Sequence, residues 1–207
     1  MQILQNPKAC NNRFTYLLIA LVFLLAGYPY WDSYVGSLVT LGLIVAGVYA
    51  VHTNARIFRG ALILGVLTAG IDIAMIVQGE RSNPLVEGAF FVFFTFITVL
   101  IFVEVMRTRY TMADTLYGAV SVYLLIGISF GQLYDLVETL QPGSFTAGFL
   151  AEGDSPGWTL LIFYSFMTLT TIGGGDITSA TDTTRSLAIL IARLIGTTST
   201  SDSSTDA

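Results

Sequence analysis

The stretch Thr168-Leu169-Thr170-Thr171-Ile172-Gly173-Gly174-Gly175-Asp176 decides how the rest of this chain is interpreted. It directly follows an apolar segment of helical character at residues 158–167. Glycine runs are typical of places where the backbone, rather than a side chain, meets a ligand. A phosphate loop does not fit, because no Lys follows the glycines and no strand precedes them. In so apolar a chain, the loop predicts carbonyl oxygens lining a narrow path. The alternative is a Gly-rich turn between two membrane segments.

The composition indicates an integral membrane protein. Of 207 residues, 54% are hydrophobic and only 11% are charged, whereas soluble domains carry roughly a quarter of charged residues. The nine basic residues form no run, so nothing indicates a nucleic-acid partner. Cys10 and His52 are the only residues of their types, which leaves no Cys/His metal site and no His-based catalytic site. We therefore expect no enzyme activity and no cofactor.

Apolar stretches predict the membrane spans, since a transmembrane helix needs about 20 mostly apolar residues. Five stretches reach or approach that length: residues 14–28, 34–51, 57–77, 85–106 and 113–133. The first is short and follows Lys8 and Arg13, as in a signal peptide, but it lacks a clear small-x-small cleavage site. We interpret it as a retained helix.

Basic residues in the short loops predict the orientation. They precede the first span and lie between the second and third and between the fourth and fifth: Lys8, Arg13, Arg56, Arg59, Arg107 and Arg109. The alternate loops hold Asp32, Glu80 and Glu87 with only Arg81. The pattern predicts a multi-pass protein of the inner (plasma) membrane, embedded in the lipid bilayer with a cytoplasmic N-terminus.

Residues 134–155 contain four acidic residues and no basic one: Asp135, Glu138, Glu152 and Asp154. Such a loop predicts an acidic outer vestibule that concentrates cations; the alternative is an ordinary solvated loop. Ser155 and Pro156 then predict a helix start, as N-cap and first helical residue. A helix from there to about Thr170 would be about 21 Å long, short of the ~30 Å hydrocarbon core. This length predicts a re-entrant loop, whose non-helical part must line a cavity or be buried in protein.

Residues Thr170 to Asp176 (TTIGGGD) resemble the selectivity filter of potassium channels, usually written TTVGYGD. The filter residues would be Thr170, Thr171, Ile172, Gly173, Gly174, Gly175 and Asp176. The resemblance implies that K⁺, the permeant ion, binds the carbonyls of Thr171, Ile172, Gly173 and Gly174, with the Thr171 hydroxyl innermost and Asp176 at the outer mouth. It also implies a homotetramer, because four chains close the ring. One departure is Gly174, where the family carries Tyr or another bulky residue. The alternative for both threonines is a hydroxyl bonded back to its own helix.

The resemblance to bacterial six-helix potassium channels covers residues 111–196. Residues 116–127 resemble the outer helix, 185–190 the start of the inner helix, and 191–196 its cytoplasmic end. A second departure is length: residues 186–196 make about 17 Å of helix, as if the middle of the inner helix were missing. The predicted organisation is a four-helix membrane unit at 1–110, a pore module at 111–196 and a disordered tail at 197–207.

The charged residues within the spans do not indicate a voltage sensor. Such a sensor carries Arg at every third position of the fourth span, and this span lacks that repeat. Asp72 lies deep in the third span; it is either functional or a packed carboxylate paired with a hydroxyl or amide.

The predicted fold class is thus an all-α integral membrane protein with five full transmembrane helices, a re-entrant pore helix with a filter loop, and a short final helix, assembled as a channel-like tetramer. The predicted function is a potassium or poorly selective cation channel. The alternative is a non-conducting or regulatory channel-like subunit with a degenerate pore.

Overall fold

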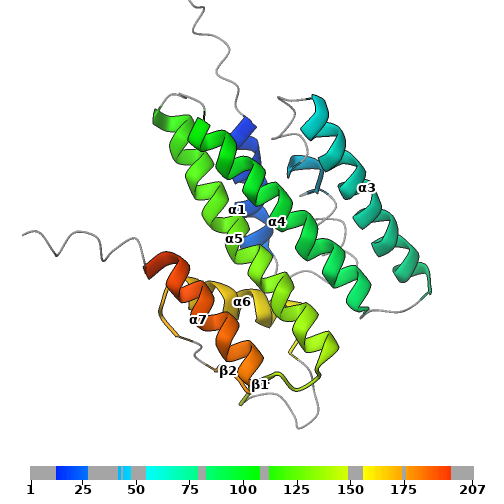
Figure 1. Cartoon of the computed structure of the whole chain (residues 1–207), viewed down its shortest axis with the longest axis vertical. Helices are drawn as coiled ribbons and strands as arrows, with labels where there is room; N and C mark the ends of the chain where they lie inside the picture. The colour runs from blue at the N-terminus through cyan, green and yellow to red at the C-terminus, as the bar shows by residue number, and fades with distance from the viewer. Residues whose placement is uncertain are drawn as a thin grey trace, which may run out of the picture. The chain divides into compact units, whose positions relative to one another are not determined.

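A computed structural model describes residues 13–27, 42, 44–47, 55–78, 83–107, 112–148, 156–173 and 176–196. These residues are mostly helical, as predicted (Figure 1). The helices are α1 (Arg13–Gly27), α3 (Ala55–Gln78), α4 (Pro84–Arg107), α5 (Met112–Leu140), α6 (Trp158–Leu169) and α7 (Asp182–Gly196). Two short strands, β1 (Phe145–Ala147) and β2 (Ile177–Ser179), were not expected. Of the predicted span 34–51, residue 42 and residues 44–47 are described, and they are helical.

Two of the described helices are long and apolar enough to cross a membrane. They are Pro84–Met106, which is most of α4, and Thr115–Leu140, which is most of α5. Hydroxyl groups inside α5 are satisfied locally: Ser121 donates to the Tyr117 carbonyl and Ser129 to the Leu125 carbonyl, each at 2.8 Å. A polar group in hydrocarbon must find a partner within the protein. These features support a membrane protein.

The chain forms two compact units. The first comprises Met1–Gly65 and Ile97–Leu124. In it, α1 buries one stripe of residues at helical spacing: Phe14, Leu17, Leu21 and Leu24. A Cβ added to Gly118 of α5 would touch Val105 and Phe14, so α1, α4 and α5 approach closely there.

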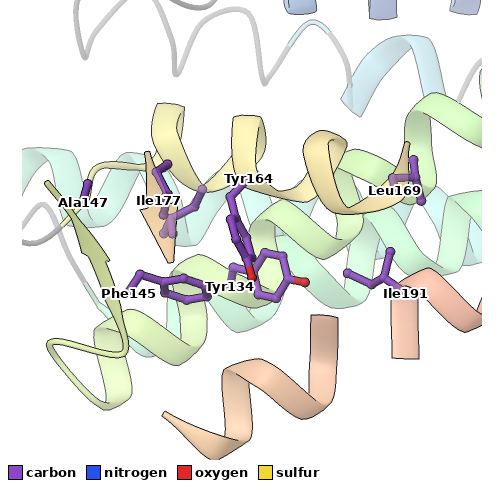
Figure 2. Packing of buried hydrophobic residues seen from close by; sticks show 8 residues of the cluster. Tyr134, Phe145, Ala147, Tyr164, Leu169, Ile177 and Ile191 are labelled. Atoms are coloured by element: carbon purple, nitrogen blue, oxygen red, sulfur yellow. The ribbon is translucent and has the colours of Figure 1, made fainter. Parts of the chain in front are cut away.

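The second unit comprises Val66–Phe96 and Leu125–Ala207. Its core is a cluster of buried side chains around α6: Tyr134, Phe145, Ala147, Leu161, Tyr164, Leu169, Ile177 and Ile191 (Figure 2). They come from α5, β1, α6, β2 and α7. The strands pair antiparallel, with Phe145 opposite Ser179 and Ala147 opposite Ile177. The segments before and after α6 are therefore held together at its side.

The structure corrects three predicted boundaries. Helix α5 has 29 residues and ends at Leu140 rather than at residue 133. Helix α6 is capped by Gly157, so the predicted start at Ser155 and Pro156 is wrong. Helix α7 has 15 residues from Asp182, not the eleven of 186–196, because a threonine caps it further upstream. The predicted division into 1–110 and 111–196 stays a prediction, and the tail 197–207 lies outside the described residues.

The candidate functional site after helix α6

Two glycines of α5 allow α6 to pack closely against it. A Cβ added to Gly127 would overlap the ring of Phe166, and one added to Gly131 would lie 2.6 Å from Cγ1 and 3.2 Å from Cα of Ile162. At the same contact, the buried Ser165 hydroxyl donates to the Gly127 carbonyl at 2.7 Å. Gly127 and Gly131 form a G-x-x-x-G pair, the spacing that lets membrane helices approach closely. This spacing is readable in the sequence, although it was not among the predicted site features.

Three aromatic rings hold α5, β1 and α6 together. The ring centroids of Tyr134, Phe145 and Tyr164 lie 5.2 to 5.3 Å apart in all three pairs, at interplanar angles of 64° to 70°. Edge-to-face pairs of this kind add about 0.5–1.5 kcal/mol each beyond buried area. Figure 2 shows the three rings between α6 and the turn that follows α5. The base of the candidate site is therefore tightly packed.

Helix α6 ends in a Schellman motif that the loop itself closes. Thr170 is the C-cap, the Thr171 N–H donates to the Thr168 carbonyl at 3.1 Å, and the Ile172 N–H to the Met167 carbonyl at 3.1 Å. Thr171 occupies the left-handed position with φ 59° and is the only described residue other than glycine with a positive φ. Glycine normally takes this place, and a β-branched residue there is strained.

Two backbone carbonyls of the loop face away from the end of α6. The N–H groups of Ile172 (3.1 Å) and Gly173 (3.3 Å) both donate to the Met167 carbonyl. The described peptide bonds are trans, so the carbonyls of Thr171 and Ile172 point opposite to those N–H groups. Among the described residues, no hydrogen bond ends on either oxygen, and the Ile172 side chain is 72% exposed. Within the described residues, two adjacent carbonyl oxygens are thus left without a hydrogen-bond donor.

The hydroxyl groups of Thr170 and Thr171 differ in their hydrogen bonding. The Thr170 hydroxyl lies 2.8 Å from the Phe166 carbonyl and 3.3 Å from the Met167 carbonyl, which confirms the back-bonded alternative for this residue. Within the described part of the chain, the exposed Thr171 hydroxyl makes no such bond. Of the two threonines, Thr171 is thus the one whose hydroxyl is not bonded back to α6 within the described residues.

The outer end of the loop is tied to the small sheet. The carbonyl of the exposed Asp176 accepts a hydrogen bond from the Gly148 N–H at 3.3 Å, and β2 begins at the next residue. Thr146 and Thr178 are directly opposite each other, with their hydroxyl oxygens 3.0 Å apart. Two of the predicted filter residues, Gly174 and Gly175, lie outside the described residues.

The predicted acidic vestibule is wrong for the residues that the structure describes. Glu138 is on α5, only 4% exposed, and accepts the N–H groups of Gly143 at 2.8 Å and Phe145 at 3.1 Å. The carboxyl group of Asp135, also on α5, hydrogen-bonds that of Glu87 on α4. Glu138 is therefore buried and Asp135 half-buried, and both carboxyl groups have hydrogen-bond partners within the protein. Glu152 and Asp154 of the same prediction lie outside the described residues.

Asp72 lies half-buried on α3, and its Oδ2 is buried without a hydrogen-bond partner among the described residues. The pairing with a hydroxyl or amide that the sequence suggested is thus not found for this oxygen.

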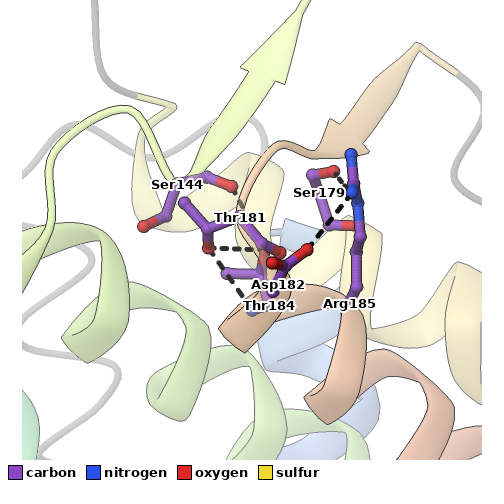
Figure 3. A network of polar contacts seen from close by, with 6 residues as sticks. All are labelled: Ser144, Ser179, Thr181, Asp182, Thr184 and Arg185. Atoms are coloured by element: carbon purple, nitrogen blue, oxygen red, sulfur yellow. Dashed lines mark hydrogen bonds and ion pairs between the residues drawn. The ribbon is translucent and has the colours of Figure 1, made fainter.

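The start of α7 is fixed by a network of hydroxyls (Figure 3). Thr181 caps the helix, with its hydroxyl 3.4 Å from the Thr184 N–H. The fully buried Thr184 hydroxyl lies 2.9 Å from the Thr181 carbonyl and 3.3 Å from the Ser144 carbonyl. Arg185 forms an exposed ion pair with Asp182 at 3.4 Å. The 15 residues of α7 make about 22 Å of helix, compared with a hydrocarbon core of ~30 Å; the shortened inner helix stays a prediction.

Comparison with known proteins supports an ion channel. A family model described as "Ion channel" matches residues 137–201, from the end of α5 through α6, the loop and α7. No curated protein and no solved structure matches the chain. The matched family favours a transport protein over an enzyme, and together with the apolar helices α4 and α5 it supports a location in a membrane.

Proposed function

We propose that this chain is one subunit of a homotetrameric channel of potassium-channel type, in which the backbone after α6 binds the permeant ion. The observation that carries the proposal is that the carbonyls of Thr171 and Ile172 turn away from the end of α6 and accept no hydrogen bond from the described residues. One chain supplies these oxygens from one side only. Four copies around an axis would form rings of carbonyls that replace an ion's hydration shell.

Electrostatics support a cation at this place. The C-terminal end of a helix carries roughly half a negative charge, and the loop follows the C-terminus of α6 directly. The Thr171 hydroxyl would be the innermost ligand, followed by the carbonyls of Thr171, Ile172, Gly173 and Gly174, with Asp176 at the outer mouth. Gly174 in place of a bulky residue predicts weak discrimination between K⁺ and Na⁺. Conduction would need no cofactor, since K⁺ is itself the transported ion.

Cation flux in liposomes that contain the purified chain tests whether the loop after α6 binds the permeant ion. We expect a tetramer after mild detergent extraction and a Tl⁺-permeable, Ba²⁺-blocked signal. Gly173→Ala should reduce the flux at least about tenfold, because Gly173 has φ 98° and alanine is strained there. Gly157→Ala is the matched control at the other end of α6, where φ is −67°, and should leave the flux unchanged. A strictly monomeric chain in bilayers would contradict the proposal.

A second candidate function is a non-conducting or regulatory channel-like subunit. The observation that favours it is the short α7 of 15 residues, which does not reach across the hydrocarbon core. Liposomes that contain a verified tetramer and carry no K⁺ or Na⁺ flux would support this candidate over the first.

A further inference from the structure

The outer end of the loop takes its position from the small sheet. Asp176 accepts the Gly148 N–H at 3.3 Å, and β2 then pairs residue by residue with β1. Beyond the sheet, the Ala180 N–H donates to the Ser144 carbonyl at 2.8 Å. The backbone of residues 176–180 is therefore hydrogen-bonded to residues 144–148 from one end to the other. A shift of β1 would move this backbone with it.

Residues 143–145 are in turn held to α5 by one side chain. The two carboxylate oxygens of Glu138 accept the N–H groups of Gly143 and Phe145, at 2.8 and 3.1 Å. The side chain is 4% exposed, so water competes little for these bonds, and bonds to an ionised acceptor are stronger than neutral ones. The ring of Phe145 adds packing on Tyr134 and Tyr164. These contacts connect the sheet to the rigid body of α5 and α6.

We infer that β1 and β2 clamp the outer end of the ion-binding loop, and that Glu138 is the residue that positions the clamp. This inference rests on the proposed function and deepens it. The inner end of the loop is fixed by the Met167 carbonyl, and the outer end by the clamp. The distance between the two attachments limits how far the carbonyls can spread, so the clamp sets ion selectivity.

The test combines amide hydrogen exchange with flux, using Glu138→Gln in the full chain. Glutamine keeps the size of the side chain, but its NH₂ group cannot accept the second backbone N–H. We expect the amides of residues 177–180 to exchange at least about tenfold faster, and the K⁺ over Na⁺ flux ratio to fall several-fold. The amides of Ile172 and Gly173, bonded to α6, should exchange at the wild-type rate. Asp182→Asn removes the same charge from an exposed site and should leave the flux ratio unchanged; it is not a control for the exchange readout, because its partner Arg185 also donates to the Ser179 carbonyl.

Two further variants keep the test decisive if Glu138→Gln fails to fold. Glu138→Asp keeps the charge but is shorter, and should give a smaller change in the same direction. In a Cys10→Ser background, Thr146→Cys with Thr178→Cys should form a disulfide, because these residues are directly opposed; failure to form it would overturn the inference.

Hydrogen exchange needs no conduction, so it separates the clamp from the channel. Silent wild-type liposomes would count against the proposed function, while exchange at 177–180 would still decide the clamp. Unchanged exchange there in both Glu138 variants would overturn the clamp, as would a selectivity change without faster exchange.

Discussion

At the scale of single residues, Thr171 is the most constrained position of the loop. Its φ of 59° costs roughly 1–2 kcal/mol for an L-residue with a side chain, while its neighbours close the end of α6. Thr171 is exposed, and among the described residues no hydrogen bond ends on its carbonyl or on that of Ile172. Strained backbone is retained where the surroundings enforce it, often at functional sites.

Comparing Thr171→Gly with Thr171→Ala isolates this strain. Both variants remove the hydroxyl and should weaken ion binding equally. Only glycine adopts the left-handed conformation freely, so we expect Thr171→Gly to be about 1 kcal/mol more stable than Thr171→Ala. Thermal unfolding in detergent measures the difference. Equal stability of the two variants would show that this residue is not left-handed in the folded protein.

At the scale of elements, the contact between α5 and α6 depends on the absence of a side chain at Gly131. A Cβ there would lie 3.2 Å from the Ile162 Cα, and backbone yields less easily than a side-chain tip. We expect Gly131→Ala to destabilise the protein by about 1–3 kcal/mol, as overpacking does, and to reduce flux by displacing α6.

Gly88→Ala on α4 is the matched control for that contact. No atom lies within 4 Å of a Cβ added at Gly88, and alanine favours a helix by about 1 kcal/mol. The control should therefore be neutral or slightly stabilising in the same unfolding experiment. A Gly131→Ala protein as stable as this control would contradict close packing of α5 on α6.

The contact between α4 and α5 depends on two carboxyl groups. Glu87 and Asp135 hydrogen-bond each other, and a carboxyl group can donate such a bond only when it carries a proton. Glu87→Gln retains a donor and should leave the unfolding temperature nearly unchanged. Glu87→Leu leaves Asp135 without its partner and should cost about 1–3 kcal/mol.

A double variant provides the check on the carboxyl pair. Because Glu87→Leu with Asp135→Leu removes both polar groups, it should recover most of the loss. If the two single leucine variants simply add, the side chains do not interact.

The helical elements were largely predictable, and the short polar contacts were not. Apolar runs indicated α1, α3, α4 and α5 because helices in a membrane must bury continuous apolar surface. The end of α5 was misplaced because Asp135 and Glu138 suggested a solvated loop, whereas Asp135 bonds Glu87 and Glu138 accepts two backbone N–H groups. Strands of three residues, such as β1 and β2, are too short to give a periodic signal.

At the scale of the whole molecule, the sequence located the candidate site but not its geometry. The motif predicted a cation-binding loop after α6, and the match at residues 137–201 supports an ion channel. The backbone has positive φ angles at Thr171 and Gly173, which composition does not encode. These angles determine which threonine hydroxyl is not bonded to the described residues and where the carbonyls point. The tetramer and the ion preference stay predictions, because one chain supplies only part of the coordination.

The length of helix α7 leads to a prediction that separates a gated channel from a degenerate pore. The helix packs Thr184 and Ile191 in the protein interior, while Ile189 and Leu190 are more than half exposed. Its 15 residues make about 22 Å of helix. If they were drawn across the ~30 Å core, Arg193 would enter the lipid at a cost of at least ~2.5 kcal/mol near the centre. A normal gated cavity is therefore not expected, and conduction should be weak and ungated.

Lengthening α7 tests this expectation directly. Inserting about ten apolar residues between Leu190 and Ile191 gives a helix of about 25 residues and 37 Å, long enough to span the core. A tag after Ala207 should then move to the cytoplasmic face, as read by protease or thiol-label access in sealed vesicles. Ten serine and glycine residues at the same point are the control and should leave the tag where it was. If the unmodified tail is already cytoplasmic and the tetramer carries robust gated K⁺ current, the degenerate-pore alternative is wrong.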